Sequence, residues 1–274
     1  MPATLHHTAA TAPAVPPAPG PAAPRVSTRG GLRTLEFQPG MVQSEMNLAD
    51  PDQLVLSYAR AMMCFVLFQP RPAHIVMVGL GGGSLAKFCY RYLPHSRITV
   101  LELRADVIAL REQFAIPPDD ERFRVIHADA SRYMASLRAA ADVLLVDGFD
   151  EDGLPPALGS AGFYADCRRA LRPGGVLVAN VFSYDPQYAA VLRRLRACFQ
   201  QRVGSFHGIA GNNRLLFAIK PGAASGAAAA PTRAQRALLR AAHRRGPAWG
   251  LAHRLLAHWI VFRLRWLKAG HSSK

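Results

Sequence analysis

The stretch "HIVMVGLGGGSLAKF", from His74 to Phe88, decides the fold. An apolar run ends at Gly79, a glycine cluster follows, and an amphipathic segment begins at Ser84. A short run of aliphatic and β-branched residues predicts a buried strand, and the segment after it has helical spacing. Glycines between a strand and a helix let a ligand approach the backbone closely. This stretch therefore predicts a strand–loop–helix binding unit.

The alternation of strand and helix continues after this unit. Further strands are expected at Ile98–Glu102, Phe123–His127, Asp142–Asp147 and Val176–Val181, with His74–Gly79 as the first. Helices are expected at Ser84–Tyr92, Ala105–Phe114, Ser131–Leu137, Ala161–Leu171 and Pro186–Gln200. Two more strands, Arg202–Phe206 and Arg214–Lys220, are close enough to form a hairpin. The pattern predicts an α/β protein with a doubly wound, mostly parallel seven-stranded sheet and an antiparallel edge hairpin.

Three ligands suit a glycine loop between a strand and a helix. A phosphate loop needs GxxxxGK[ST], whereas Lys87, the nearest lysine, lies within the expected helix. A dinucleotide loop needs GxGxxG, and Ser84 occupies the third glycine position. S-adenosylmethionine and its decarboxylated form carry a sulfonium and an adenosine but no phosphate. For these two cofactors the glycine loop needs only to leave room for the ligand beside the backbone.

Acidic residues after the next two strands separate the remaining alternatives. Glu102 ends the second strand, 23 residues after Gly79, where a carboxylate can accept both ribose hydroxyls. Asp129 follows the third strand and can accept from an adenine amino group, or cap the next helix, or both. With the "LRPGG" turn at Leu171–Gly175, these acids favour a Rossmann-like, S-adenosylmethionine-type fold over an NAD fold.

An acidic loop follows the fourth strand in "ADVLLVDGFDEDGLP". Asp147, Asp150, Glu151 and Asp152 lie at the edge where open α/β sheets bind ligands. Clustered carboxylates favour a cation among them, and a diamine dication would suit. One carboxylate can take the proton of an attacking amine while another holds the far ammonium. A solvated loop without function is the alternative, chiefly for Glu151 and Asp152.

Residues Leu35–Lys220 resemble the spermidine synthase (aminopropyltransferase) family. The likeness rests on "VMVGLGGGSL", "VLEL", "HADA", "LLVDGFD" and "FYADCRRALRPGGVLVAN". It implies that Asp147 is the amine base and that Asp150 positions the amine. It also places Glu102 at the ribose and Asp129 at the adenine.

The resemblance also implies a wider binding site. Cofactor-binding positions are Gly79, Gly81, Gly82, Gly83, Glu102, Asp129 and Gln43, and substrate-binding positions are Tyr58, Asp147 and Asp150. Gly82 stands where the family has an aspartate that contacts the aminopropyl amine. The leading hypothesis is aminopropyl transfer from decarboxylated S-adenosylmethionine to an amine such as putrescine, without a metal. A methyltransferase that uses intact S-adenosylmethionine and a non-catalytic family member are the alternatives.

The rest of the chain divides by composition. Residues 1–30 are rich in Ala and Pro and are expected to be disordered. Residues 31–70 are expected to form a short strand and helix segment, and the catalytic domain follows at residues 71–220. Thr34–Phe37 is the expected strand, and Asp50 is the expected N-cap of a helix that runs to Phe68. Residues 221–231 are a linker, and 232–274 form a basic amphipathic helical tail with helices at Arg233–Arg245 and Leu251–Leu267.

Charge and composition restrict the function further. The formal charge is +15, but residues 221–274 hold ten Lys or Arg and no acidic residue. The rest of the chain is therefore only mildly basic, and nucleic acid is not an expected partner. The four cysteines form no CxxC pair. No apolar run reaches the roughly 20 residues of a membrane span, and no secretory signal is evident. We expect a cytoplasmic enzyme with a small amine substrate. The sequence leaves open whether the chain forms a homodimer. It also leaves open whether the tail contacts an anionic membrane surface or a partner subunit.

Overall fold

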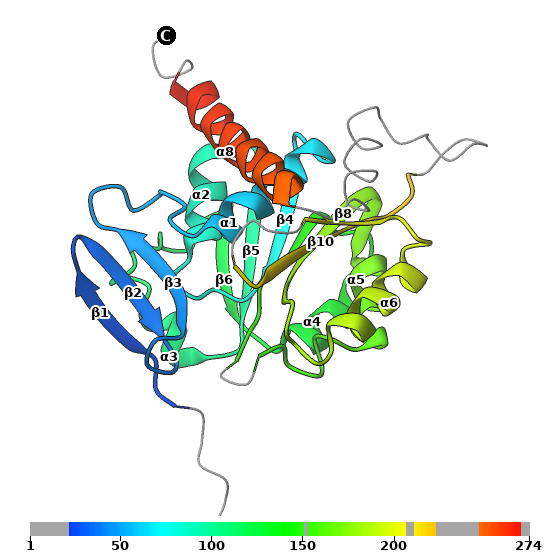
Figure 1. The fold of residues 1–274 in the computed structure, drawn as a ribbon, viewed down its shortest axis with the longest axis horizontal. Coiled ribbons are helices and arrows are strands. Elements are labelled where there is room, and N and C mark those ends of the chain that lie inside the picture. Colours follow the sequence, from blue (N-terminus) through cyan, green and yellow to red (C-terminus); the bar gives the residue numbers. More distant parts are fainter. Residues whose placement is uncertain (1–21, 151–152, 207–210, 223–246, 270–274) are drawn as a thin grey trace, which may run out of the picture.

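The main sheet of the computed structural model has seven strands, and the structure describes residues 22–150, 153–206, 211–222 and 247–269 (Figure 1). Their order is β6 (Phe123–His127), β5 (Arg97–Glu102), β4 (His74–Val78), β7 (Ala141–Val146), β8 (Leu171–Phe182), β10 (Asn213–Ile219) and β9 (Val203–Phe206). β10 runs antiparallel to both of its neighbours, and the other pairs are parallel. The predicted parallel sheet with an edge hairpin is confirmed.

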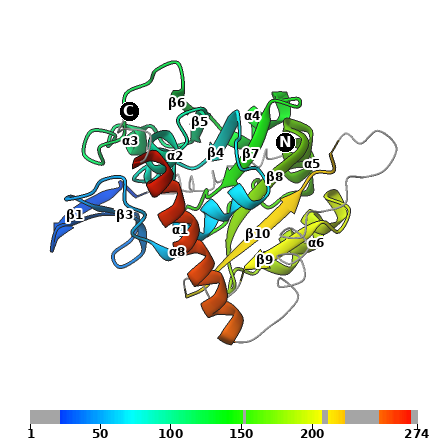
Figure 2. The ribbon, with the colours of Figure 1, turned by 90° about the horizontal axis from the view of Figure 1, so that it is seen from above.

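Helices cover both faces of this sheet (Figures 1 and 2). One layer contains α4 (Ala130–Ser136), α5 (Ala161–Ala170) and α6 (Tyr188–Cys198). The other contains α1 (Ser57–Met62), η1 (Met63–Leu67), α2 (Ser84–Tyr92) and α8 (Pro247–Ala269). Successive strand residues face opposite sides, so Ile75 and Met77 join one buried cluster and Val76 and Val78 join the other.

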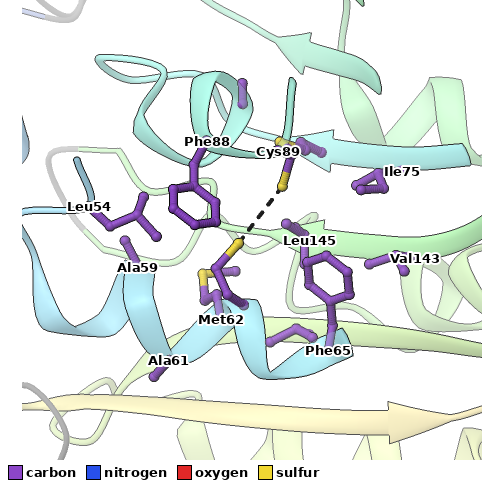
Figure 3. Close-up of a cluster of buried hydrophobic side chains, with 14 of the residues drawn as sticks. Leu54, Ala59, Ala61, Met62, Phe65, Ile75, Phe88, Cys89, Val143 and Leu145 are labelled. Atoms are coloured by element: carbon purple, nitrogen blue, oxygen red, sulfur yellow. Dashed lines mark hydrogen bonds between the residues drawn. The ribbon is translucent and has the colours of Figure 1, made fainter. Parts of the chain in front are cut away.

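The buried cluster under α1 and η1 fixes their position on the sheet (Figure 3). Met62 and Phe65 pack with Ile75 of β4 and Leu145 of β7, and all four side chains are fully or nearly fully buried. The Cys89 thiol of α2 lies 3.8 Å from the sulfur of Met63. Because α1 is anchored in this way, the residues at its start have a defined position relative to the strand ends.

A second, antiparallel sheet precedes the main domain. It consists of β1 (Arg25–Arg29), β2 (Leu32–Glu36) and β3 (Val42–Asn47), in that order. The hairpin between β1 and β2 turns at Gly30-Gly31, with φ of 56° and 77°, as a tight hairpin requires. The prediction of disorder up to residue 30 is therefore wrong for residues 22–30. β1 reads "RVSTR" and is mostly exposed, so backbone pairing forms it without an apolar pattern.

The predicted helix start at Asp50 is also wrong. Residues 51–56 are not helical, and α1 begins at Ser57. The Asp50 carboxylate instead accepts a hydrogen bond from Arg265 Nη2 at 2.6 Å. Asp50 therefore pairs with Arg265, 215 positions away in the sequence, and does not cap a helix.

Two other element boundaries differ from the prediction by five or six residues. The helix expected at Ala105–Phe114 is the short α3 (Ala105–Ile108), and the chain turns at Ala115, where φ is 50°. This turn buries Phe114 and Ile116 on either side of it. β8 begins at Leu171 rather than Val176, because the "RPGG" segment forms an irregularity at which the pairing with β7 shifts register.

The tail contributes one long helix to the described part of the chain. α8 lies across α1 in Figure 2. The helix predicted at Arg233–Arg245 falls outside the described residues. No helix in the described ranges is both long and apolar enough to cross a membrane.

Candidate active site

The glycine loop brings the ends of β4 and β7 together. Gly79 has φ of 93°, and a Cβ on it would lie 2.3 Å from the Asp147 carbonyl oxygen. The Asp147 N–H donates to Val78 O at 2.9 Å, and the Gly79 N–H donates to Leu101 O at 2.9 Å. Only glycine can occupy this position, because both the backbone angle and the contact exclude a side chain.

A cavity of about 710 Å³ opens at the carboxyl ends of the parallel strands. This volume is within the range of small-molecule sites, and the location matches the switch point of a doubly wound sheet. Eight of the predicted site residues line it: Gln43, Tyr58, Gly79, Gly81, Glu102, Asp129, Asp147 and Asp150.

Gly82 and Gly83 are not among the residues that line the cavity. Both are buried, and they face the segment that follows α3. A Cβ on Gly82 would lie 2.7 Å from Ser44 Oγ and 2.8 Å from Phe114 Cδ1. A Cβ on Gly83 would lie 2.5 Å from Ile116 Cγ1. These two glycines allow close packing beneath the loop.

Glu102 links the glycine loop to the end of β5. Its Oε2 accepts from the Leu80 N–H at 2.8 Å, and its Oε1 accepts from the Arg104 N–H at 2.9 Å. The carboxylate is only 8% exposed. A carboxylate has about four acceptor sites, so each oxygen keeps one for a ligand hydroxyl. The two backbone donors hold the side chain toward the cavity.

Asp129 caps α4 and also faces the cavity. Its Oδ1 accepts from the Ser131 N–H at 2.8 Å and from the Ser131 hydroxyl at 2.6 Å. These bonds, with the Ser131 hydroxyl as the largest cause, lower the pKa of Asp129. The predicted cap is therefore present, and the same carboxylate remains on the cavity wall.

Asp147 is the carboxylate most modified by its surroundings. It follows β7 directly, and its Oδ1 accepts from Asn180 Nδ2 of β8 at 2.9 Å. The Tyr58 hydroxyl also acts on this carboxylate. Burial raises the pKa of Asp147, and the Asn180 amide and the Tyr58 hydroxyl oppose the rise without cancelling it. Desolvation, followed by the nearby Asp147 charge, raises the pKa of Tyr58, so the phenol remains a donor.

Asp150 lies on the exposed side of the cavity, three residues further on. Its N–H donates to Gly153 O at 3.0 Å, and the two residues form an isolated antiparallel bridge. Glu151 and Asp152, the other acids predicted in this loop, lie outside the described residues. The described ranges contain no cluster of three or more residues that could hold a metal ion.

The part of the chain that contains this cavity matches a known protein family. A family model described as the spermine/spermidine synthase domain matches residues 55–201. The chain belongs to the spermine/spermidine synthase family. The match includes Tyr58, the glycine loop and all four carboxylates of the cavity.

Two relatives in this family are close in sequence. The polyamine aminopropyltransferase of Neisseria meningitidis serogroup B is 43% identical over 180 residues, which is 65% of this chain and 68% of the relative. That of Chromobacterium violaceum is 41% identical over 179 residues, or 65% of this chain and 69% of the relative. The family resemblance inferred from the motifs is thereby confirmed.

Solved structures show the same fold. A probable spermidine synthase from Corynebacterium glutamicum has a TM-score of 0.63 at 22% identity, covering 72% of this chain and 76% of that one. Human methyltransferase-like protein 13 in complex with SAH has a TM-score of 0.54 at 22% identity, covering 75% and 92%. At these identities the likeness concerns the fold alone, which is common to both kinds of protein.

Several residues of the site in this family member were not predicted. Asn180 interrupts the apolar strand "GVLVANVF", and a polar residue in such a run is the signal that could have identified it. Its Oδ1 accepts from Asn213 Nδ2 of β10 at 2.9 Å. An aromatic wall of Phe149, Phe182 and Tyr184 was missed because Phe149 lies 33 residues before Phe182. The ring centroids of Phe149 and Phe182 are 4.5 Å apart, and those of Phe182 and Tyr184 are 5.2 Å apart. All three residues line the cavity.

Proposed function

We propose that this chain transfers an aminopropyl group from decarboxylated S-adenosylmethionine to a primary amine of a diamine or polyamine such as putrescine. The observation that carries the proposal is the position of Asp147. It lines the cavity with a raised pKa, and Asn180 holds it by a hydrogen bond. Membership of the spermine/spermidine synthase family supports the same reaction.

The proposed chemistry uses Asp147 as the base. A primary ammonium has a reference pKa of about 10.4 and cannot attack carbon while it is protonated. The ionised Asp147 removes one proton, and the amine nitrogen then bonds to the methylene carbon next to the sulfonium. The carbon–sulfur bond breaks, its electron pair stays on sulfur, and a neutral thioether leaves without an acid. A raised pKa makes Asp147 a stronger base than an exposed aspartate.

The other lining residues have separate roles in the proposal. Glu102 accepts from the ribose hydroxyls, and Asp129 accepts from the adenine amino group. Asp150 and the aromatic wall, Phe149, Phe182 and Tyr184, hold the amine substrate, whose methylene chain lies between charged ends. Gly81 and Leu80 leave backbone beside the sulfonium. Most of the acceleration would come from alignment of amine and carbon in this cavity.

Gly82 gives the amino group of the aminopropyl donor a different environment from the family pattern. A side chain there would collide with Ser44 and Phe114. We therefore assign the donor's ammonium to the same acidic side of the cavity as the acceptor amine, where Asp147 and Asp150 serve both amines. This assignment favours the decarboxylated donor, because the additional carboxylate of intact S-adenosylmethionine would meet those anions.

The test combines turnover and binding. Purified full-length protein is incubated with decarboxylated S-adenosylmethionine and a panel of diamines and polyamines, and the aminopropylated products are measured. Asp147→Asn should lower turnover by roughly 100-fold or more, while calorimetry shows the nucleoside thioether product still bound. Glu121→Gln, an exposed residue outside the cavity, is the matched control and should retain wild-type rates.

Three results would reject this function. The wild type could form no product with any amine of the panel. Asp147→Asn could turn over at the wild-type rate. Intact S-adenosylmethionine could bind more tightly than the decarboxylated form and donate its methyl group.

A further inference from the structure

α8 has two apolar faces, and only one of them is covered. His253, Ala257, Ile260 and Val261 are between 2% and 9% exposed and pack onto the body. The His253 ring stacks on Phe206 with centroids 4.2 Å apart. This face is part of the same buried cluster as α1 and η1. α8 is therefore a fixed part of the fold.

The second apolar face is exposed to solvent. It consists of Leu251, Leu255, Trp259, Phe262 and Trp266, which are between 50% and 67% exposed. At about 100° per residue, these five positions fall within a sector of about 80°, opposite the buried face. We call them the α8 stripe. Half of the exposed large hydrophobic side chains in the described chain belong to it, so it is a concentrated surface feature.

Cations border the α8 stripe on both sides. Arg254 lies along one edge and Arg263 along the other, and both are exposed. The Arg263 guanidinium lies 5.3 Å from the centroid of the Trp259 ring. Arg265 is paired with Asp50 and is not part of this border. The α8 sequence contains no acidic residue.

We propose that the α8 stripe docks on an anionic lipid bilayer, with the helix lying in the plane of the interface. Helices that lie in the membrane interface typically have Trp, Phe and Leu on one face and basic residues beside it. The α8 stripe has this composition. Aliphatic and indole groups enter the boundary between headgroups and acyl chains, and Arg254 and Arg263 remain at the depth of the phosphates. The helix does not span the membrane, in agreement with its limited hydropathy.

Charge separates a bilayer from a second copy of the chain as the occupant. Two α8 stripes that met face to face would bring Arg254 and Arg263 of each copy together without any acidic residue from either helix. An anionic surface neutralises the same residues, and each is then attracted to it. This inference goes beyond the proposed catalytic function and does not depend on it.

Vesicle binding tests the proposal, and the protein contains its own probe. All three tryptophans, Trp249, Trp259 and Trp266, belong to α8. Full-length protein is mixed with vesicles of phosphatidylcholine alone or with about one third phosphatidylglycerol, and binding is measured by flotation and by the shift in tryptophan emission. We expect binding and a blue shift with the anionic vesicles, roughly tenfold weaker with the neutral ones, and release at high salt.

Two pairs of variants isolate the surface. Leu255→Gln with Phe262→Gln should lower the partition constant at least tenfold. Met41→Gln with Leu48→Gln, at two exposed apolar residues that flank β3, should leave it unchanged. Arg254→Glu with Arg263→Glu should lower it at least tenfold on anionic vesicles. Arg124→Glu with Arg193→Glu, exposed residues elsewhere, makes the same change in net charge and should have a smaller effect.

Circular dichroism and thermal unfolding establish that each variant is folded. The proposal is overturned if the wild type does not bind the anionic vesicles, or if the stripe variant binds as well as its control. It is also overturned if sedimentation shows a concentration-dependent dimer that the stripe variant abolishes, because the occupant is then a second copy.

Discussion

Asn180 Nδ2 donates a hydrogen bond of 2.9 Å to Oδ1 of Asp147. The amide belongs to a buried strand, and Asn213 fixes it in turn by donating to its carbonyl oxygen. Because the amide donates to the carboxylate, it favours the ionised form and lowers the pKa of Asp147. The asparagine therefore orients the proposed base and limits the effect of burial on its titration.

Asn180→Ala should move the acid limb of the pH–rate profile to higher pH. Without the amide donor, less counteracts the rise in pKa that burial causes. The pKa of Asp147 therefore increases, and the base is ionised only at higher pH. We expect kcat/KM at neutral pH to fall by roughly tenfold or more. The profile of kcat/KM against pH checks this. A lower rate with an unchanged midpoint would assign Asn180 a packing role only.

Tyr58→Phe should move the same limb in the same direction. It removes a hydroxyl that also lowers the pKa of Asp147, but it leaves the hydrogen bond from the Asn180 amide intact. The two variants combined should shift the midpoint further than either alone, because both donors act on one carboxylate. Asn213→Ala, which leaves the Asn180 donor in place, should give a smaller shift. A larger shift from Asn213→Ala than from Asn180→Ala would contradict this order.

Glu102→Gln should weaken both the fold and co-substrate binding. The wild-type carboxylate accepts one backbone N–H on each oxygen, and an amide can accept on only one side. One buried N–H donor then faces an NH₂ group, which costs about 1–3 kcal/mol of unfolding free energy. Denaturant unfolding and calorimetry with the nucleoside thioether measure the two effects. Unchanged stability with weaker binding would show that the backbone bonds are unimportant.

Gly82→Asp should destabilise the protein. Its Cβ would lie within 2.8 Å of both Ser44 Oγ and Phe114 Cδ1, which are buried. Overpacking and a buried carboxylate together should cost about 3 kcal/mol, although the substitution restores the residue expected from the family pattern. Unfolding by urea measures the loss. Adding Phe114→Leu makes room and should recover part of it, whereas a stable single variant would contradict the packing argument.

The strands of the parallel sheet could be predicted because burial on both faces leaves continuous apolar runs. The same reasoning located Glu102, Asp129 and Asp147, since polar residues at the ends of such runs meet at one edge. β1 gave no such signal, because its side chains are mostly exposed and only its backbone is paired. Exposed strands of this kind depend on a partner strand.

Other features depend on contacts between distant residues. The Asp50-Pro51 pair is a local helix signal, but the Asp50 carboxylate binds Arg265 of α8. The role of Asn180 likewise depends on the alignment of β8 with β7. The packing of Phe114 onto Gly82 follows from a turn after α3. None of these contacts has a periodicity that a sequence pattern could report.

Lys87 of α2 lies beneath the glycine loop and is 2% exposed. Its Nζ donates to Phe114 O at 2.6 Å and lies 3.0 Å from the sulfur of Met46. Burial lowers the pKa of Lys87 to about 8, although the charge of Asp52 acts in the opposite direction. The loop that carries the site is thus supported by a lysine that titrates near neutral pH.

Lys87→Met should remove a pH dependence of stability. Below about pH 8 the lysine is protonated in both states, and burial of the charge lowers the stability of the wild type by a constant amount. Between about pH 8 and the unfolded value near 10.4, the folded state has lost this proton and the unfolded state has not. Stability of the wild type therefore rises with pH in this window, by up to roughly 3 kcal/mol relative to the methionine variant. Urea unfolding of both proteins from pH 7 to 10 measures the difference, and parallel curves would mean that Lys87 titrates normally in the folded protein.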